Sequence, residues 1–309
     1  MAKILFYFLI IPGFLYAAII GLLATWYDRK LTARIQWRQG PPLYQPFADI
    51  LKLLGKETIV PQGPSRIIFI SAPILSLVAV TVVSAMLWLT NIIRYFSFNG
   101  DIILIALLLM VPSLALIIGG SLSKNPLSEA GVSREKRLLL AYEIPFVIAI
   151  SIAAMRSGSL AIAGIIGYQS VHGTIISSLS GAIAFLISIF VVQAQLGFVP
   201  FDMTEAEQEI EGGPMLEYSG RLLAVFKLTK AMLLFVLPML LITLYLGGLD
   251  MYSWTNILWF IIKFIIILIL LILIKNTNPR VRIDQAVRFF YRPMTVLAVI
   301  GLILASRGW

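Results

Sequence analysis

Residues 4–26 read ILFYFLIIPGFLYAAIIGLLATW, a run of 23 residues without a charged side chain, and Asp28-Arg29-Lys30 follows almost at once. A helix of about 20 apolar residues crosses the roughly 30 Å hydrocarbon core of a bilayer. The run is too long for the apolar core of a signal peptide, and its main charged flank follows it. We therefore predict that this segment is a retained transmembrane helix.

Seven further apolar runs of similar length follow. The chain is 60% hydrophobic and only 13% charged, a balance that a soluble domain of 309 residues would not show. The sequence predicts a single all-α, polytopic membrane domain over residues 1–309, with about eight transmembrane helices. The predicted spans are 4–26, 67–89, 102–122, 138–155, 174–197, 222–247, 254–274 and 289–305.

The distribution of positive charge predicts the topology. Most Lys and Arg residues lie in the connections 27–66, 124–137 and 275–288, and positive charge marks the cytoplasmic side. These connections, together with 198–221, are therefore expected to face the cytoplasm, with both termini outside the cell membrane. The net charge of +9 reflects this topology, so we expect the lipid bilayer and no nucleic acid as a partner.

The first cytoplasmic connection carries more structure than anchoring requires. After Gly40-Pro41-Pro42, the segment 44–54 places Phe47, Ile50, Leu51 and Leu54 on one helical face, as an interfacial amphipathic helix would. We predict a surface here that docks a soluble partner subunit. Its candidate residues are Arg29, Lys30, Arg34, Arg38, Asp49, Lys52, Lys56 and Glu57.

The chain has no cysteine, and His172 is its one histidine, placed in a predicted outward loop. It therefore lacks the ligands of an iron-sulfur cluster or a Cys/His zinc site. We expect no metal, cofactor or catalytic residue in this chain, and electron transfer in partner subunits.

Acidic residues are concentrated between Asp202 and Glu217, which hold six of the fifteen in the chain. If the stretch is helical, Asp202, Glu205 and Glu209 share one face. Clustered carboxylates repel one another, which raises some pKa values and lets the group pass protons at neutral pH. The alternative is a solvated acidic loop.

Charged residues inside predicted spans give a second signal. Glu143 lies about 7 Å inside the fourth span at 1.5 Å per residue, and it faces either a hydrated path or the headgroups. Lys263, near the middle of the seventh span, is expected to face the protein interior, whereas Lys227 and Lys230 lie nearer the cytoplasm, within snorkelling reach. The candidate proton or ion relay residues are Glu143, Asp202, Glu205, Glu207, Glu209, Glu217 and Lys263.

These segments together resemble the membrane subunit shared by respiratory complex I and energy-converting nickel-iron hydrogenases, the eight-helix junction subunit of complex I. The motifs that carry the resemblance are Asp28-Arg29-Lys30, Arg34, Arg38-Gln39-Gly40-Pro41, Gln45-Pro46, Asp49, Lys52-Leu53, Lys56-Glu57, Ala141-Tyr142-Glu143, Pro200-Phe201-Asp202, Thr204-Glu205-Ala206-Glu207 and Glu217-Tyr218. Asp28 stands where the family commonly has Glu. Gly213-Pro214 ahead of Glu217-Tyr218 resembles the hydrogenase and formate-hydrogenlyase branch.

The resemblance implies a complex that couples ferredoxin oxidation and proton reduction to proton or sodium translocation. It implies nickel-iron hydrogenase large and small subunits, an iron-sulfur subunit and antiporter-like membrane subunits as partners. The nickel-iron centre and iron-sulfur clusters would lie in those partners, and ferredoxin would donate the electrons. The acidic positions would link the redox module to the ion path.

Other functions stay open at this level. The first alternative is a complex I junction subunit that helps to form a quinone chamber, and a related sulfur reductase is also compatible with the motifs. A stand-alone ion transporter is a further alternative, although the chain shows no inverted repeat with matching broken helices.

Overall fold

The computed structural model describes residues 8, 10, 13–61, 66–249 and 254–308. In chain order its helices are α2 (Phe14–Ile35), α3 (Gln45–Gly55), α4 (Arg66–Ile92), α5 (Asp101–Ser121), α6 (Pro126–Ser157), α7 (Ile162–His172), α8 (Leu179–Gln195), α9 (Glu207–Ile210), α10 (Gly220–Tyr245), α11 (Trp254–Thr277), α12 (Ile283–Phe289) and α13 (Thr295–Ser306). Short 3-10 turns lie at Arg94–Phe96, Ile175–Ser177 and Gly213–Met215, and a π-helical turn at Phe290–Met294 joins α12 to α13.

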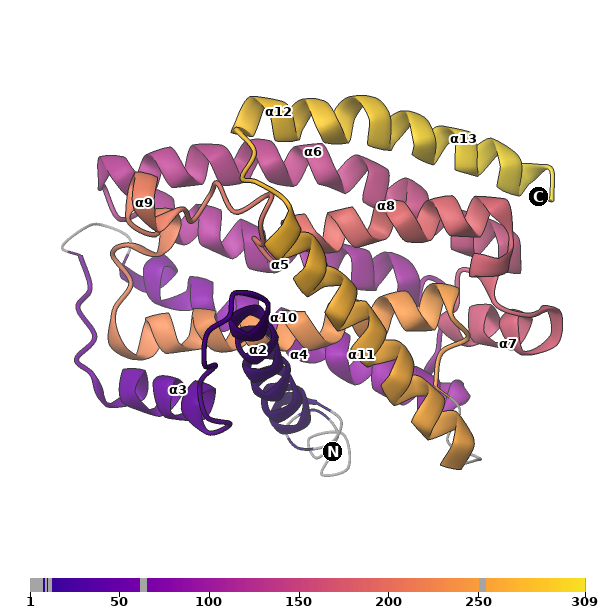
Figure 1. The fold of residues 1–309 in the computed structure, drawn as a ribbon, viewed down its shortest axis with the longest axis horizontal. Coiled ribbons are helices and arrows are strands. Elements are labelled where there is room, and N and C mark those ends of the chain that lie inside the picture. The colour runs from indigo at the N-terminus through magenta and orange to yellow at the C-terminus, as the bar shows by residue number, and fades with distance from the viewer. Residues whose placement is uncertain (1–7, 9, 11–12, 62–65, 250–253, 309) are drawn as a thin grey trace.

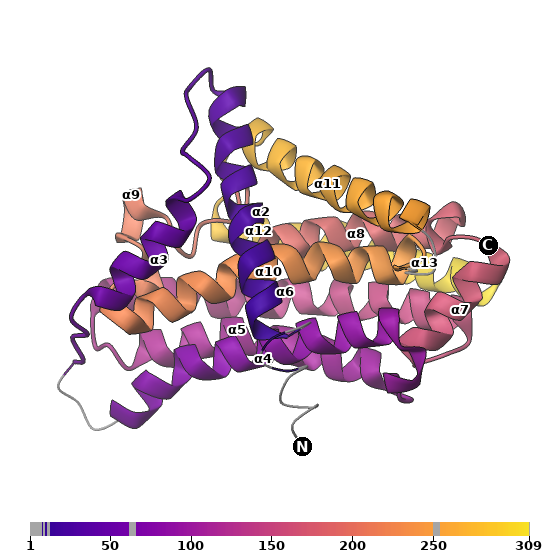
Figure 2. The same cartoon turned by 90° about the horizontal axis from the view of Figure 1, so that it is seen from below.

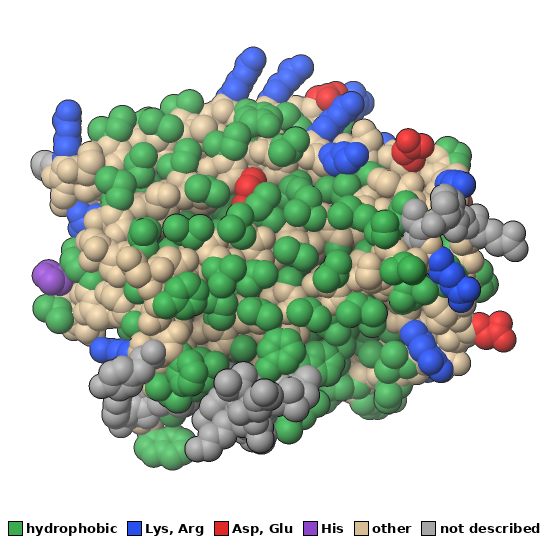
Figure 3. All heavy atoms as spheres, turned by 180° about the vertical axis from the view of Figure 1, so that it is seen from behind, with side chains coloured by type: hydrophobic (Ala, Val, Ile, Leu, Met, Phe, Trp, Pro, Cys, Tyr) green, Lys and Arg blue, Asp and Glu red, His purple; other side chains and the backbone are tan. Residues whose placement is uncertain are grey.

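The described helices form one bundle with the dimensions of a membrane domain. Six helical stretches are long and apolar enough to cross a bilayer, namely α4, α5, α6, α10, α11 and the continuous stretch α12–α13, and α8 is apolar but shorter. Helix α2 continues the first predicted span. Hydrophobic side chains cover the middle of the face in Figure 3, and Lys and Arg project mainly from its edges. The prediction of an all-α polytopic membrane protein is confirmed, with six to eight membrane-spanning helices.

The bundle has two different ends. Helices α4, α5, α6, α8 and α10 run side by side, while α2 and α11 cross them obliquely (Figures 1 and 2). Helices α3 and α9 and the connection 196–219 gather at one end, which we call the α3 end. Helix α7 and the end of α13 lie at the other, the α7 end.

Helix α10 is the centre of the bundle. It contacts α2, α3, α4, α8 and α11, and every residue from Ala231 to Tyr245 is buried. A helix that is apolar all round fits such an interior position. Where α2 crosses it, Gly21 is so close that a Cβ atom there would lie 2.4 Å from the carbonyl oxygen of Ala231. Glycine at this position permits the close crossing.

Several helix boundaries differ from the predicted spans. Helix α2 continues to Ile35, so Arg29, Lys30 and Arg34 lie on a helix and not in a loop. The chain turns only at Trp37, whose backbone φ is +58°. Hydropathy marks where a helix leaves the apolar layer, but the backbone continues until a residue stops it.

Helix α6 begins at Pro126 instead of residue 138. The Asn125 side chain accepts a hydrogen bond from the Leu127 backbone N–H, and Pro126 occupies the first helical position, which together make a strong helix start. The predicted span 174–197 is a 3-10 turn followed by α8. Helix α7 was not predicted, and His172 is its exposed last residue.

Candidate functional site

The carboxylates of the acidic stretch each pair with a cation from a different element. Asp202 pairs with Arg280 at 2.8 Å, and Glu209 pairs with Arg134 of α6 at 2.6 Å. Glu205 pairs with Lys230 of α10. Only Glu207–Ile210 is helical, so the expectation that Asp202, Glu205 and Glu209 share a helical face is wrong. Their repulsion is offset by distant basic residues.

The remaining acidic residues of this stretch differ in role. Glu217 accepts a hydrogen bond of 2.7 Å from the Asn125 amide at the start of α6, which ties the stretch to the turn between α5 and α6. The side chain of Glu207 lies outside the described residues. Burial raises the pKa of Asp202 above its usual value, although the charge of Arg280 opposes the shift.

A further acidic residue, Glu135, lies in the interior and was missed as a site residue. It is 8% exposed, and the side chains of Ser113 and Thr204 lie within hydrogen-bonding reach of its carboxylate. Ser128, Glu135 and Tyr142 follow one another at intervals of seven residues, which places all three on the buried face of α6. The capping signal at Asn125-Pro126 would have revealed that Glu135 is helical.

Two hydroxyl groups extend this polar region into the bundle. The Ser113 Oγ of α5 lies 3.1 Å from the Tyr142 hydroxyl, and Tyr142 is completely buried. Glu143 follows on α6, half-buried, and its Oε2 is buried without a hydrogen-bond partner among the described residues. No hydrogen bond or ion pair of the described residues joins Glu143 to the acidic stretch.

A large cavity of about 610 Å³ opens at the α3 end. Leu22, Asp28 and Arg29 of α2 form one wall, and α3, α10 and the connection after α8 complete it. Its lining alternates apolar side chains with charged ones. The charged ones are Asp28, Arg29, Asp49, Lys52, Lys56, Glu205, Lys227 and Lys230.

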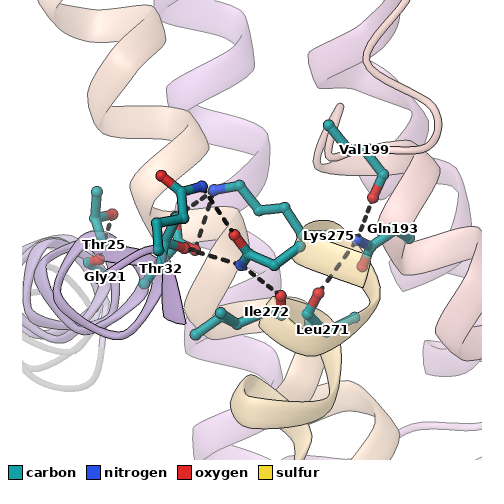
Figure 4. Close-up of polar contacts among 11 residues, drawn as sticks. Gly21, Thr25, Thr32, Gln193, Val199, Leu271, Ile272 and Lys275 are labelled. Carbon is teal, nitrogen blue, oxygen red and sulfur yellow. Dashed lines mark hydrogen bonds and ion pairs between the residues drawn. The ribbon is translucent and has the colours of Figure 1, made fainter. Parts of the chain in front are cut away.

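Ion pairs hold the walls of the large cavity together. Arg29 bonds Asp49 of α3 at 2.8 Å, and this hydrogen bond holds the pKa of the Asp49 carboxyl below its usual value. Asp28 pairs with Lys275 of α11 at 2.7 Å. Figure 4 shows Lys275 reaching from α11 toward α2, close to Thr32. Three helices far apart in the sequence are thereby fixed around one cavity.

A small cavity of about 20 Å³ lies next to the large one. Gly197, Glu205 and Lys230 line both cavities, and Glu135 lines only the small one. The Glu205–Lys230 pair therefore stands between an open cavity and a buried carboxyl group.

The predicted docking residues lie around the α3 end. Lys30 points inward, with its Nζ 3.4 Å from the carbonyl oxygen of Gly40. Trp37, in the same connection, is 98% exposed, which is unusual for the largest apolar side chain. The other predicted docking residues on the exposed surface are Arg29, Arg34, Arg38, Lys52, Lys56 and Glu57.

Lys263 is separate from the acidic residues. Its Nζ donates a hydrogen bond of 2.5 Å to the carbonyl oxygen of Leu246, just beyond the end of α10. Leu246 lies 16 residues after Lys230, or about 24 Å along a helix. Among the described residues, no group of three or more His, Cys, Asp or Glu side chains could hold a metal ion.

Comparison with known proteins identifies the family. The family model for NADH dehydrogenase matches residues 7–306. A membrane component of the NADH-quinone oxidoreductase of Brevibacillus brevis is 31% identical, with 97% of this chain and 92% of the relative covered, and its counterpart in Dehalococcoides mccartyi is 30% identical, with 98% and 86% covered. A chain in the structure of the membrane-bound sulfane sulfur reductase, an archaeal respiratory membrane complex, matches with a TM-score of 0.88 at 31% identity, covering 99% of this chain and all of that one.

These matches confirm the resemblance to the complex I junction subunit predicted from the motifs. They name a quinone oxidoreductase and a sulfur reductase, and neither name assigns the chain to the hydrogenase branch. The chain belongs to the NADH dehydrogenase family and is a multi-pass membrane subunit of the complex I-like respiratory type.

Proposed function

We propose that this chain is the junction subunit of an ion-translocating respiratory complex. Its α3 end faces the cytoplasm and docks the redox subunits, and its interior carboxyl groups pass charge changes toward antiporter-like membrane subunits. The observation that carries this proposal is the position of the Glu205–Lys230 pair between the large cavity and buried Glu135.

The arrangement suits electrostatic coupling because its charged groups are close and poorly hydrated. A charge that appears in or near the large cavity changes the balance between Glu205 and Lys230. In a medium of low dielectric constant this change alters the proton affinity of the neighbouring Glu135. The carboxyl groups then titrate as a coupled set and not one by one.

The α3 end also supplies a surface for the redox subunits. Exposed Arg34, Arg38, Lys52 and Lys56 present positive charge beside the apolar Trp37 side chain. Charge of one sign speeds association with an oppositely charged partner, and a central aromatic residue contributes affinity.

The experiment replaces single carboxyl groups in the assembled complex. Glu205→Gln and Glu135→Gln keep size and hydrogen-bonding capacity but cannot titrate. After reconstitution into vesicles, we expect each variant to move fewer ions per electron pair, with proton and sodium uptake recorded separately. Glu129→Gln is the matched control, because Glu129 is exposed on the same helix six residues earlier. Unchanged ion movement per electron in both interior variants would disprove the coupling role.

For the redox chemistry we first propose a quinone acceptor. The curated relatives are named as components of NADH-quinone oxidoreductases. The large cavity combines apolar walls from Leu22, Ile50 and Leu234 with charged groups, and a quinone has both an apolar tail and a polar ring. Such a mixed lining is typical of sites for amphiphilic ligands.

The second candidate is a quinone-independent complex of the hydrogenase or sulfur-reductase type, with ferredoxin as donor. Eight charged side chains line the large cavity, which is a costly lining for an apolar tail. The sulfane sulfur reductase chain is also similar over its full length. Assaying the purified complex with a short-chain quinone, protons and polysulfide as acceptors separates the two candidates.

A further inference from the structure

The small cavity contains more polar groups than hydrogen bonds to satisfy them. It lies between α4, α5, α6, α8 and α10, and its lining includes Ser76, Ser113, Glu135, Gln195 and Glu205. A volume of about 20 Å³ exceeds the ~10–15 Å³ that one water molecule requires when volume is counted over water-sized probes.

Ser76 is the first of the unsatisfied groups. It is completely buried on α4, and its hydroxyl has no hydrogen-bond partner among the described residues. Buried hydroxyls elsewhere in the bundle bond to their own helix, as Thr81 does to the Leu77 carbonyl at 2.7 Å and Ser188 to the Ala184 carbonyl at 2.8 Å. Ser76 departs from this pattern and faces the small cavity instead.

Gln195 is the second. Its amide oxygen and nitrogen are both buried, and within the described part of the chain neither has a hydrogen-bond partner. Gln193, two residues earlier, bonds the carbonyl oxygens of Val199 and Leu271 at 2.7 and 3.3 Å (Figure 4). A buried polar group without a partner costs about 1–3 kcal/mol, so the lining of the small cavity calls for a polar guest.

We propose that the small cavity binds a water molecule, held by Ser76 and Gln195, that relays protons between Glu205 and Glu135. The relay part rests on the coupling function proposed above, whereas the binding site does not. In one transfer the Glu205 carboxyl releases a proton to the water, and the water gives another of its protons to the Glu135 carboxylate. The water ends neutral, and one proton has moved inward.

Ser76 and Gln195 are positioning residues in this scheme. Neither titrates in the physiological range, but together they offer two donors and two acceptors, and a buried water typically makes about three hydrogen bonds. They orient the water so that its lone pair meets one carboxyl and its O–H the other. The polar environment that suits proton transfer is thus supplied from α4 and α8, outside the acidic stretch.

The binding site is tested by a high-resolution electron cryo-microscopy map of the assembled complex in lipid. We expect a density peak within about 3 Å of both the Ser76 Oγ and the Gln195 amide, and its loss or displacement in Ser76→Ala. A small cavity without density, or one closed by a direct Ser76–Gln195 hydrogen bond, would overturn the proposal.

The relay is tested by ion movement per electron in the Gln195 variants. Gln195→Met matches the size but cannot hold the water, and we expect roughly a tenfold loss, the rate equivalent of about 1.4 kcal/mol for one hydrogen bond. Gln195→Glu restores both polar contacts and adds a titratable group, so it should retain coupling and shift its pH profile, which a purely structural role would not do. Wild-type coupling in Gln195→Met refutes the relay.

Two further variants keep the test decisive. Ser76→Ala removes a single oxygen, so it reports on coupling even if Gln195→Met fails to assemble, and Ser188→Ala is its control as a buried serine remote from the small cavity. Loss of coupling in Glu135→Gln but not in Ser76→Ala or Gln195→Met would refute the relay and leave the proposed function intact. Normal coupling in the Glu205 and Glu135 variants would refute the proposed function, while the density peak would still decide the water site.

Discussion

Lys275 of α11 donates hydrogen bonds to both carboxylate oxygens of Asp28 on α2, at 2.7 and 3.0 Å. Its ammonium group also lies 4.3 Å from the centroid of the Phe198 ring. Asp28 is only 5% exposed, so this pair is a buried ion pair that joins the first and seventh predicted spans. It holds α2 and α11 together beside the large cavity.

We expect Asp28→Asn to destabilise the subunit, because it leaves the Lys275 ammonium without its counter-charge. Removing one partner of a buried pair costs about 3 kcal/mol. The thermal unfolding midpoint in detergent measures the effect. The double variant Asp28→Asn with Lys275→Met should recover much of the loss, and Asp49→Asn at the more exposed Arg29–Asp49 pair should cost much less. Equal effects at both sites would contradict this assignment.

Trp37 is expected to anchor the docked redox subunits. A buried interface tryptophan contributes about 2 kcal/mol or more, so Trp37→Ala should weaken binding of the peripheral subunits roughly 30-fold. The amount of those subunits that co-purifies at increasing salt measures the change. Trp254→Ala is the control, because Trp254 is 84% exposed at the α7 end. If the control weakens binding equally, Trp37 is not part of a docking surface.

The topology can be tested without removing any native thiol, since the chain has no cysteine. Trp37→Cys at the α3 end should react with a membrane-impermeant maleimide only in inverted vesicles. Val171→Cys, at a residue 78% exposed on α7, should react only from outside intact cells. Labelling of both positions from one side would rule out the predicted arrangement.

Asp202 is expected to make stability depend on pH. Burial raises its folded-state pKa above the unfolded value, so the folded state retains a proton that the unfolded state has lost. Its contribution to stability therefore falls as pH rises from the unfolded pKa through the raised one. Asp202→Asn should remove this slope in thermal midpoints measured across the acidic range. Arg280→Gln should steepen it, because the opposing charge is lost, and a slope unchanged in both would exclude Asp202 as its source.

Glu143 is predicted to serve coupling more than folding. Glu143→Gln should assemble with its partner subunits but move fewer ions per electron in inverted vesicles. Turnover with an artificial dye checks that the redox centres of the partners are intact. Normal ion movement at normal turnover would make Glu143 a structural residue, consistent with its lack of contact with the acidic stretch.

The fold could be predicted from the sequence because a bilayer imposes a length on every apolar run. The run from 254 to 274 indicates a span without any knowledge of its neighbours, and the structure places α11 there. Boundaries were harder, since hydropathy ends at Trp26 whereas the backbone of α2 stays helical to Ile35. Asn125 shows that capping chemistry would have corrected the start of α6.

The candidate site was predicted only in part, because its geometry comes from distant segments. The acidic stretch was visible, but its partners Arg134, Lys230 and Arg280 come from three other elements. Glu135 stood among basic residues that suggested a surface loop. The unsatisfied atoms of Ser76 and Gln195 become evident only when five helices are packed around them.

The width of the large cavity depends on a residue that has no side chain. Its two facing walls are α2 and α10, and these helices meet at Gly21 and Ala231, where the backbones nearly touch. A methyl group at position 21 would push α2 away from α10, and the displacement would carry Leu22, Asp28 and Arg29 outward with it. The smallest residue of α2 therefore acts as the spacer that calibrates the aperture, and drift at this position would alter the site without changing any residue that contributes a charge to it.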